Sequence, residues 1–224
     1  MRFRTVLASI LILAMFTMLP DGLAKKKSKK KKKKKQNITK IIPKKEFTEA
    51  LLKLADDERV PRASSTLVEK GRGEDYYSVE KMLDDNPETF WAEGAKGWGK
   101  NEWVAFHVPD GTTHVEITSG AGKEQFENFN RPRELFVDYY LVRLKRDKEE
   151  DKYKPKFKWL GRTLFKFKDK PETLRNKVGI KLPELVLAQR TMYIGVIIIR
   201  KVYKGQFDDT SLATVRTSAI WGEE

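Results

Sequence analysis

Residues 192–202 read MYIGVIIIRKV, and this stretch decides how the chain folds. Val-Ile-Ile-Ile at residues 196–199 would place apolar side chains on both sides of an extended backbone. A short continuous apolar run of this kind is typical of a strand that is buried on both faces. We therefore predict that residues 192–202 form a central strand of a sheet.

Shorter strand-like runs, separated by Gly, Pro, Asn and Asp, surround this segment from Arg62 onward. Most of them alternate between apolar and polar residues, and no long helical pattern separates them. This texture predicts an antiparallel all-β sandwich, a class of fold in which many short strands form two facing sheets. The other predicted strands cover residues 102–108, 114–119, 135–144, 164–168 and 215–221.

One helix is expected ahead of this sandwich. Apolar residues recur at helical spacing from Phe47 to Ala55, so we predict an amphipathic helix within residues 44–58. Its apolar face would pack on the sandwich domain, expected over residues 59–222, or would bind a partner.

The net charge of +14 is concentrated in one tract, Lys25–Lys35, which contains ten lysines and one serine. Residues 36–224 together carry only +3. The lysine side chains repel one another, and the tract has no apolar side chains to bury in a core. We therefore expect residues 25–43 to be a disordered leader. The tract would bind an anionic polymer in a salt-dependent way, or act as a solubilising linker. Nucleic acid is not expected as the ligand of the nearly neutral sandwich.

Residues 1–24 have the pattern of an export signal. Arg2 and Arg4 precede an apolar run, and small residues precede a predicted cleavage point after Ala24. The apolar run is shorter than the ~20 residues of a membrane span, so no stable span is expected after cleavage. The alternative is an uncleaved anchor, because the following lysines resist translocation. We expect a secreted or periplasmic, cell-envelope protein.

The composition excludes several kinds of chemistry. The chain has no cysteine and two histidines, so disulfides, thiolate metal sites and cysteine nucleophiles are ruled out. A glycosidase would need two carboxylates on opposite sides of the scissile bond. Asp85 and Glu93 are the candidate carboxylates if the protein were a glycosidase. Their closeness in the sequence, within a turn, does not place them on opposite sides of a bond. The prediction is a protein that is not an enzyme.

Several motifs resemble a known family. Residues 63–67 (ASSTL) and 77–91 (YSVEKMLDDNPETFW) resemble the opening of a discoidin domain, also called the coagulation factor five/eight type C domain. Residues 93–103 (EGAKGWGKNEW) and 128–135 (NFNRPREL) resemble a subgroup, the bacterial NADase-type glycan-binding domain, which is the translocation module of some secreted NAD glycohydrolases. The Lys-Gly and Asp-Asp-Thr of residues 204–210 match the end of that subgroup.

The resemblance covers about residues 60–222. It implies a galactose-binding-like (discoidin, jelly-roll) β-sandwich that binds glycans through loops at one end. It does not imply NADase activity, because no catalytic domain accompanies the module here.

The turn at Asp84, Asn86 and Thr89 is rich in oxygen atoms, which suit Ca²⁺. In carbohydrate-binding relatives this turn often holds a structural calcium completed by a glutamate near the C-terminus. Thr214 stands in that place here. The alternative is a turn in which Asp and Asn bond their own backbone, and no other cofactor is expected.

Trp98 is the leading candidate for ligand contact. It lies between Gly97 and Gly99 and is flanked by Lys96 and Lys100, where no helix or strand pattern would bury it. An exposed indole ring can stack against the apolar face of a sugar. The alternative is that the ring folds back over the end of the sandwich and covers the core. Two other tryptophans, Trp91 and Trp103, are expected in the core.

Asn128, Asn130 and Arg131 precede the predicted strand 135–144, and their polar side chains complete the predicted site. Asn offers donors and an acceptor, and Arg offers a rigid fork of donors. The alternative is loop stabilisation, with Arg131 paired to Glu93 or Glu127. Of two adjacent tyrosines at this end, Tyr76 and Tyr77, one is expected to point inward and one outward. The predicted ligand-binding set is Tyr77, Glu93, Lys96, Trp98, Asn128, Asn130 and Arg131.

Lysines alternate with aromatic residues over residues 152–159. This alternation suits either a nucleic-acid strand or, more in keeping with the pattern, an edge strand whose lysines block unwanted pairing and whose aromatics face the core.

The sequence therefore predicts an exported, non-catalytic module that binds a glycan or another cell-surface ligand. The alternative is a polyanion-binding scaffold that acts through its lysine tract, with the sandwich making protein contacts.

Overall fold

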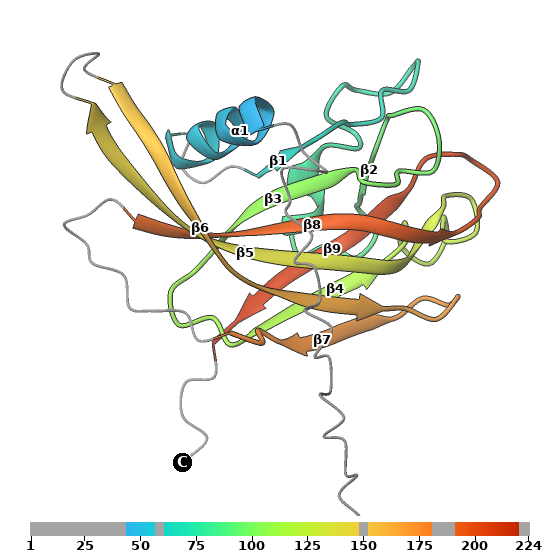
Figure 1. Cartoon of the computed structure of the whole chain (residues 1–224). Coiled ribbons are helices and arrows are strands. Elements are labelled where there is room, and N and C mark those ends of the chain that lie inside the picture. Colours follow the sequence, from blue (N-terminus) through green and yellow to red (C-terminus); the bar gives the residue numbers. More distant parts are fainter. Residues whose placement is uncertain (1–43, 57–60, 148–151, 181–190, 220–224) are drawn as a thin grey trace, which may run out of the picture. The chain divides into compact units, whose positions relative to one another are not determined.

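The computed structural model describes residues 44–56, 61–147, 152–180 and 191–219 (Figure 1). The predicted signal of residues 1–24 and the lysine leader of residues 25–43 lie outside the described residues. Among the described residues, no helix combines the length and the hydrophobicity needed to cross a membrane. The elements in chain order are α1 (Lys44–Asp56), β1 (Arg62–Ala63), the 3₁₀ helix η2 (Val79–Leu83), β2 (Trp91–Ala92), β3 (Trp103–Val108), β4 (His114–Ser119), β5 (Arg131–Asp147), β6 (Lys152–Lys166), β7 (Thr173–Lys177), β8 (Thr191–Tyr203) and β9 (Ser211–Ser218).

The strands form two antiparallel sheets that face each other, which confirms the predicted all-β sandwich. The five-stranded sheet has the order β1-β3-β8-β5-β6, and the four-stranded sheet has the order β2-β9-β4-β7. Strand β8 lies in the middle of the larger sheet, paired with β3 on one side and β5 on the other. The apolar run at residues 192–202 is therefore the central strand that its sequence predicts.

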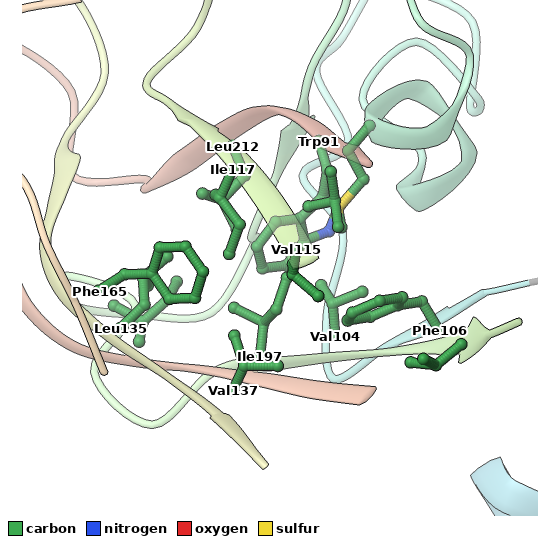
Figure 2. Packing of buried hydrophobic residues seen from close by; sticks show 14 of the residues in the cluster. Trp91, Val104, Phe106, Val115, Ile117, Leu135, Val137, Phe165, Ile197 and Leu212 are labelled. Carbon is green, nitrogen blue, oxygen red and sulfur yellow. The ribbon is translucent and has the colours of Figure 1, made fainter. Parts of the chain in front are cut away.

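The main hydrophobic core fills the space between the two sheets (Figure 2). Trp91 is fully buried there, and its indole N–H donates to the carbonyl oxygen of Ser65 over 3.1 Å. Trp103 is buried on the opposite face of the larger sheet. Both tryptophans are thus core residues, as their positions in the sequence predict.

Helix α1 covers part of the outer face of the five-stranded sheet (Figure 1). Phe47, Ala50 and Leu54 lie on one side of the helix because residues three and four apart share a face. The Phe47 ring packs edge-on against the rings of Tyr140 and Phe157, each at a centroid distance of 5.3 Å. The helix therefore packs on the sandwich, as the first of its two predicted alternatives states.

Strand β6 is an edge strand of the larger sheet. Lys154, Lys156 and Lys158 are exposed on it, while Phe157 packs under α1. Trp159 departs from the prediction that the aromatics face the core, because it is 38% exposed. Its neighbourhood contains a β-bulge, with a register shift between Tyr139 and Tyr140 on the paired strand, and such irregularities redirect side chains.

A buried ion pair joins β5 and β6 beside the helix-covered face. Arg162 donates from Nε and Nη2 to the two carboxylate oxygens of Asp138, over 2.6 and 2.7 Å. The Asp138 side chain has no exposed surface. The Asp138 carboxylate raises the pKa of the Arg162 guanidinium, against the opposing effect of burial. This two-pronged geometry fixes the register of the two strands.

Candidate ligand-binding end of the sandwich

Three connections meet at one end of the sandwich, the end away from the tip of the β5–β6 hairpin (Figure 1). They are residues 93–102, 120–130 and 204–210, called here the Trp98 loop, the Asn128 loop and the Lys204 loop. The Glu93 amide donates to the Thr210 carbonyl over 3.0 Å, and the Phe207 amide donates to the Asn128 carbonyl over 2.7 Å. Backbone hydrogen bonds therefore connect the Lys204 loop to both of the others.

Trp98 is exposed on its loop, with 51% of its surface accessible. The backbone beneath it is held in place, because the Thr210 hydroxyl donates to the Trp98 carbonyl over 3.1 Å. The flanking glycines adopt left-handed conformations, with φ of 115° at Gly97 and 62° at Gly99. A Cβ at Gly99 would lie 2.9 Å from a Glu93 carboxylate oxygen, so this turn requires glycine.

One face of the Trp98 indole is occupied by a cation. The Lys204 ammonium lies 3.8 Å from the ring centroid, at a distance typical of a cation–π contact. The contact places the Lys204 ammonium over one face of a ring that is otherwise half exposed. Lys204 was not among the predicted site residues, although its Lys-Gly segment was part of the family resemblance.

Glu93 has no exposed surface, so it holds the loop together and does not reach a ligand. Its carboxylate oxygens accept hydrogen bonds from the backbone amides of Ala95, over 2.8 Å, and Thr210, over 3.1 Å. Burial raises the pKa of Glu93 to about 7, although the two amide donors act in the opposite direction. The carboxylate therefore serves as an internal acceptor linking the Trp98 loop to the start of β9.

Asn130 and Arg131 are also buried, at 1% and 7% exposure. The Asn130 side chain donates to the Asp208 carbonyl and accepts from the Gly205 amide, which clamps the Lys204 loop. Arg131 donates from Nε and Nη2 to one carboxylate oxygen of Asp169, over 2.9 and 2.7 Å. The prediction that Arg131 would pair with Glu93 or Glu127 is therefore wrong; its partner lies 38 residues further along the chain.

The remaining predicted residues divide between interior and surface. Tyr77 is buried against Phe90 and Phe129 and donates its hydroxyl to Glu69 over 2.7 Å, whereas Tyr76 is exposed, so one tyrosine points inward and one outward as predicted. Lys96 is exposed and Asn128 is half-buried. The predicted set thus includes three residues with accessible side chains, Lys96, Trp98 and Asn128.

The Asp84–Thr89 turn bonds to itself. The Asn86 amide and the Thr89 hydroxyl both donate to the Asp84 carboxylate, and the Glu88 amide donates to the Asn86 side chain. The Arg216 guanidinium donates to the Asp85 carboxylate over 2.6 Å and to its carbonyl over 3.0 Å. Oxygens satisfied by protein donors, with a guanidinium beside them, do not fit a calcium site, so no role is derived for the metal.

The family comparison identifies the class of domain. The family model for the NAD glycohydrolase translocation F5/8 type C domain matches residues 55–217. This match agrees with the resemblance drawn from the sequence motifs, and it extends from before β1 to the penultimate residue of β9. No curated protein matches the chain.

Solved structures with a similar arrangement come from bacterial proteins. The CBM32-1 and CBM32-2 domains of Clostridium perfringens ZmpB, in complex with GalNAc, are 12% identical at a TM-score of 0.44, over 72% of this chain and 33% of theirs. An F5/8 type C domain from Bacteroides fragilis is 10% identical at a TM-score of 0.42, over 70% and 89%. The C-terminal domain of a B. fragilis chitobiase is 18% identical at a TM-score of 0.39, over 71% and 95%. The chain thus spans about a third of the length of the ZmpB fragment.

Proposed function

The chain belongs to the family of NAD glycohydrolase translocation F5/8 type C domains, and on that premise we propose that it is an exported, non-catalytic module that recognises glycans at the loop end of its sandwich. The discoidin-like sandwich itself is the fold of the chain.

The observation that carries the proposal is the exposed and immobilised ring of Trp98. Burying an aromatic ring against an apolar surface is favourable, and an exposed ring forgoes that gain unless a ligand covers it. Trp98 is held outward by Gly97, Gly99 and Thr210 and is oriented by Lys204. A ring fixed in advance loses little conformational freedom when a ligand stacks on it, which favours binding.

Polar groups on the Trp98 loop and on the Asn128 loop suit the hydroxyls of a sugar. Lys96 is exposed on the same loop, and Asn128, which is half-buried, offers a side-chain amide from the adjacent loop. The side-chain NH₂ of Asn128 donates one hydrogen bond to the Gln125 side chain over 2.8 Å. Its second N–H and its side-chain oxygen can therefore bond a ligand. The proposed contact set is therefore Trp98, Lys96 and Asn128, supported from beneath by Glu93, Asn130 and Arg131.

The acidic residues favour a non-catalytic role over a glycosidase. Glu93 is enclosed by backbone amides, and Asp85 is paired with Arg216 on an exposed turn. A glycosidase needs both carboxylates to approach one bond from opposite sides. Neither of these two carboxylates is free to do so, and hydrolytic turnover that depends on Glu93 or Asp85 would contradict the proposal.

The test is a glycan array probed with the full chain and with Trp98→Ala. Removing a stacking ring should weaken binding of the recognised glycan by roughly ten- to a hundredfold, the equivalent of about 1–3 kcal/mol. Trp159→Ala is the matched control, since it removes another exposed tryptophan from β6 and should leave binding unchanged. Undiminished binding by Trp98→Ala would place the site elsewhere.

The lysine tract supports one alternative function. Ten lysines within residues 25–35 would attract an anionic polymer without specificity for its sequence or linkage. In that case the tract would carry the binding and the sandwich would contact other proteins.

A further inference from the structure

A groove of about 470 Å³ lies beside Trp98. It is bounded by the Trp98 loop and by the adjacent ends of β5 and β8, and Phe136 connects it to the cluster beneath α1. Its volume falls within the ~300–1,000 Å³ of typical small-ligand sites. The residues that line it are Trp98, Lys100, Arg133, Glu134, Phe136, Arg200, Lys201 and Val202.

The charged residues of this groove are predominantly basic. Among the described residues, four cationic side chains and one carboxylate line it, and that carboxylate, Glu134, is already bound by the Lys201 ammonium over 2.9 Å. Lys100 and Arg133 are exposed and make no ion pair among the described residues. Since residues 36–224 carry a net charge of only +3, this is a local concentration of charge on a nearly neutral domain.

The two arginines of the groove, Arg200 and Arg133, are oriented by contacts other than ion pairs. Arg200 donates to the Asn101 side chain over 2.7 Å, and its guanidinium lies 5.4 Å from the centroid of the Phe136 ring. The Arg133 guanidinium lies 5.6 Å from the centroid of Tyr203. Stacking on an aromatic ring orients a guanidinium and leaves its N–H donors available to an anion.

The pKa of Glu134 reflects the positive charges around it. The hydrogen bond from Lys201 lowers the pKa of this carboxyl below its usual value, against the opposing effect of burial, and the nearby charges of Lys201, Lys166 and Arg133 lower it further. The groove therefore favours negative charge at a point next to an exposed indole.

We propose that this groove receives the sulfate or carboxylate group of an acidic saccharide whose ring rests on Trp98. The inference builds on the proposed glycan-binding function and names its ligand class. An acidic sugar offers both features that the surface can recognise: an apolar ring face for the indole, and an anionic group for Lys100, Arg133 and Arg200. Arg presents parallel donors that match sulfate and carboxylate geometry.

The experiment compares three hexasaccharides with the same backbone, by calorimetry on the full chain in about 150 mM salt, where long-range attraction is screened beyond ~8 Å. They are chondroitin sulfate, chondroitin without sulfate, and chondroitin with its carboxylates reduced. The first two distinguish sulfate from carboxylate as the recognised group, and the third is neutral. The variant Lys100→Ala/Arg133→Ala removes the two cations that have no ion pair, and melting curves check that it folds.

Wild type should bind at least one acidic hexasaccharide at least about tenfold more tightly than the neutral one, and the double variant should lose about ten- to a hundredfold of that affinity. Binding of the neutral hexasaccharide should not change. The control Lys158→Ala/Lys177→Ala removes two exposed lysines from β6 and β7 and retains the lysine tract, so it should bind as wild type does.

Two results would overturn the inference: no preference of wild type for an acidic hexasaccharide, or equal losses in the groove variant and the control. The Trp98→Ala variant separates this failure from that of the proposed function. If it weakens sugar binding while the groove variant keeps full affinity for the acidic forms, only the acidic specificity is wrong. If it leaves all sugar binding intact, the stacking site itself is wrong.

Discussion

Glu93 illustrates at the residue scale how a fully buried polar group can hold a surface loop in place. Its carboxylate accepts from the amides of Ala95 and Thr210, two donors that burial would otherwise leave unsatisfied. An unsatisfied buried donor costs about 1–3 kcal/mol. The geometry of the Trp98 loop therefore depends on a side chain that lies beneath it.

The raised pKa of Glu93 predicts a pH dependence of stability. The folded value of about 7 exceeds the model-peptide value of 4.5, so the folded chain holds this proton more tightly than the unfolded chain does. The resulting stabilisation is complete below about pH 4.5 and is lost as the pH rises through 7, with a span of up to about 3 kcal/mol. Urea denaturation across this range should show this decline in wild type.

The matched variant for that measurement is Glu93→Gln, which cannot titrate. It should be less stable overall, because its amide group cannot replace both acceptors, but it should lack the decline between pH 4.5 and 7. Identical slopes in the two proteins would show that Glu93 titrates normally in the fold.

Local sequence patterns predicted the exposure of Trp98 better than the pairing of the buried residues near it. The glycines around Trp98 are local signals, and they indicated an exposed ring. Glu93, Asn130 and Arg131 gave only local hints, whereas their partners Thr210, Gly205 and Asp169 lie 117, 75 and 38 residues away. Partners at such separations are brought together by the fold of the whole sheet, so their pairing cannot be read from nearby sequence.

At the scale of elements, the strands with strong hydrophobic patterns were predictable and those without were not. The predicted range 114–119 coincides with β4, and the buried run at 192–202 lies within β8. Strand β7, Thr173–Lys177, was missed, because its residues alternate only between exposed and half-buried positions at the edge of the smaller sheet. Strand β6 was predicted as two pieces, since the bulge near Gly161 interrupts its alternation.

The ion pair between β5 and β6 yields a prediction at this scale. Asp138→Asn leaves the Arg162 guanidinium largely buried without its counter-ion, and should lower the free energy of unfolding by about 3–5 kcal/mol. The double variant Asp138→Leu/Arg162→Met removes both charges and should recover most of that loss. Chemical denaturation of the single and double variants measures both effects.

An exposed pair provides the comparison. Lys45 and Glu49 on α1 lie 3.9 Å apart, and their side chains are largely accessible. Glu49→Gln should change stability by less than about 0.5 kcal/mol, since surface pairs contribute little. Similar losses in Asp138→Asn and Glu49→Gln would mean that the buried pair has no special importance.

At the scale of the whole molecule, charge and fold belong to different parts of the chain. Ten of the positive charges lie in residues 25–35, whereas residues 36–224, which include the sandwich, carry a net charge of only +3 and have a basic groove beside Trp98. Binding to polyanions and recognition of a specific saccharide should therefore be separable.

Deleting residues 25–35 tests that separation. Retention on immobilised heparin should become much weaker, with affinity at about 50 mM salt falling by tenfold or more, because fewer counterions are released on binding. Binding that a free sugar can compete should persist. If the deletion abolished the sugar-competable binding as well, the lysine tract would be the functional element and the sandwich would serve protein contacts.

The buried clamps at Glu93 and Asn130 have a consequence for protein engineering. They fix the frames of the Trp98 and Lys204 loops from within, so the exposed positions between them are free to vary without altering the loop backbone. A combinatorial library restricted to Lys96, Lys100 and Phe207, which are exposed, would sample new specificities on an unchanged scaffold. Antibody loops are adaptable for the same reason, because a rigid scaffold carries loop tips that can be replaced.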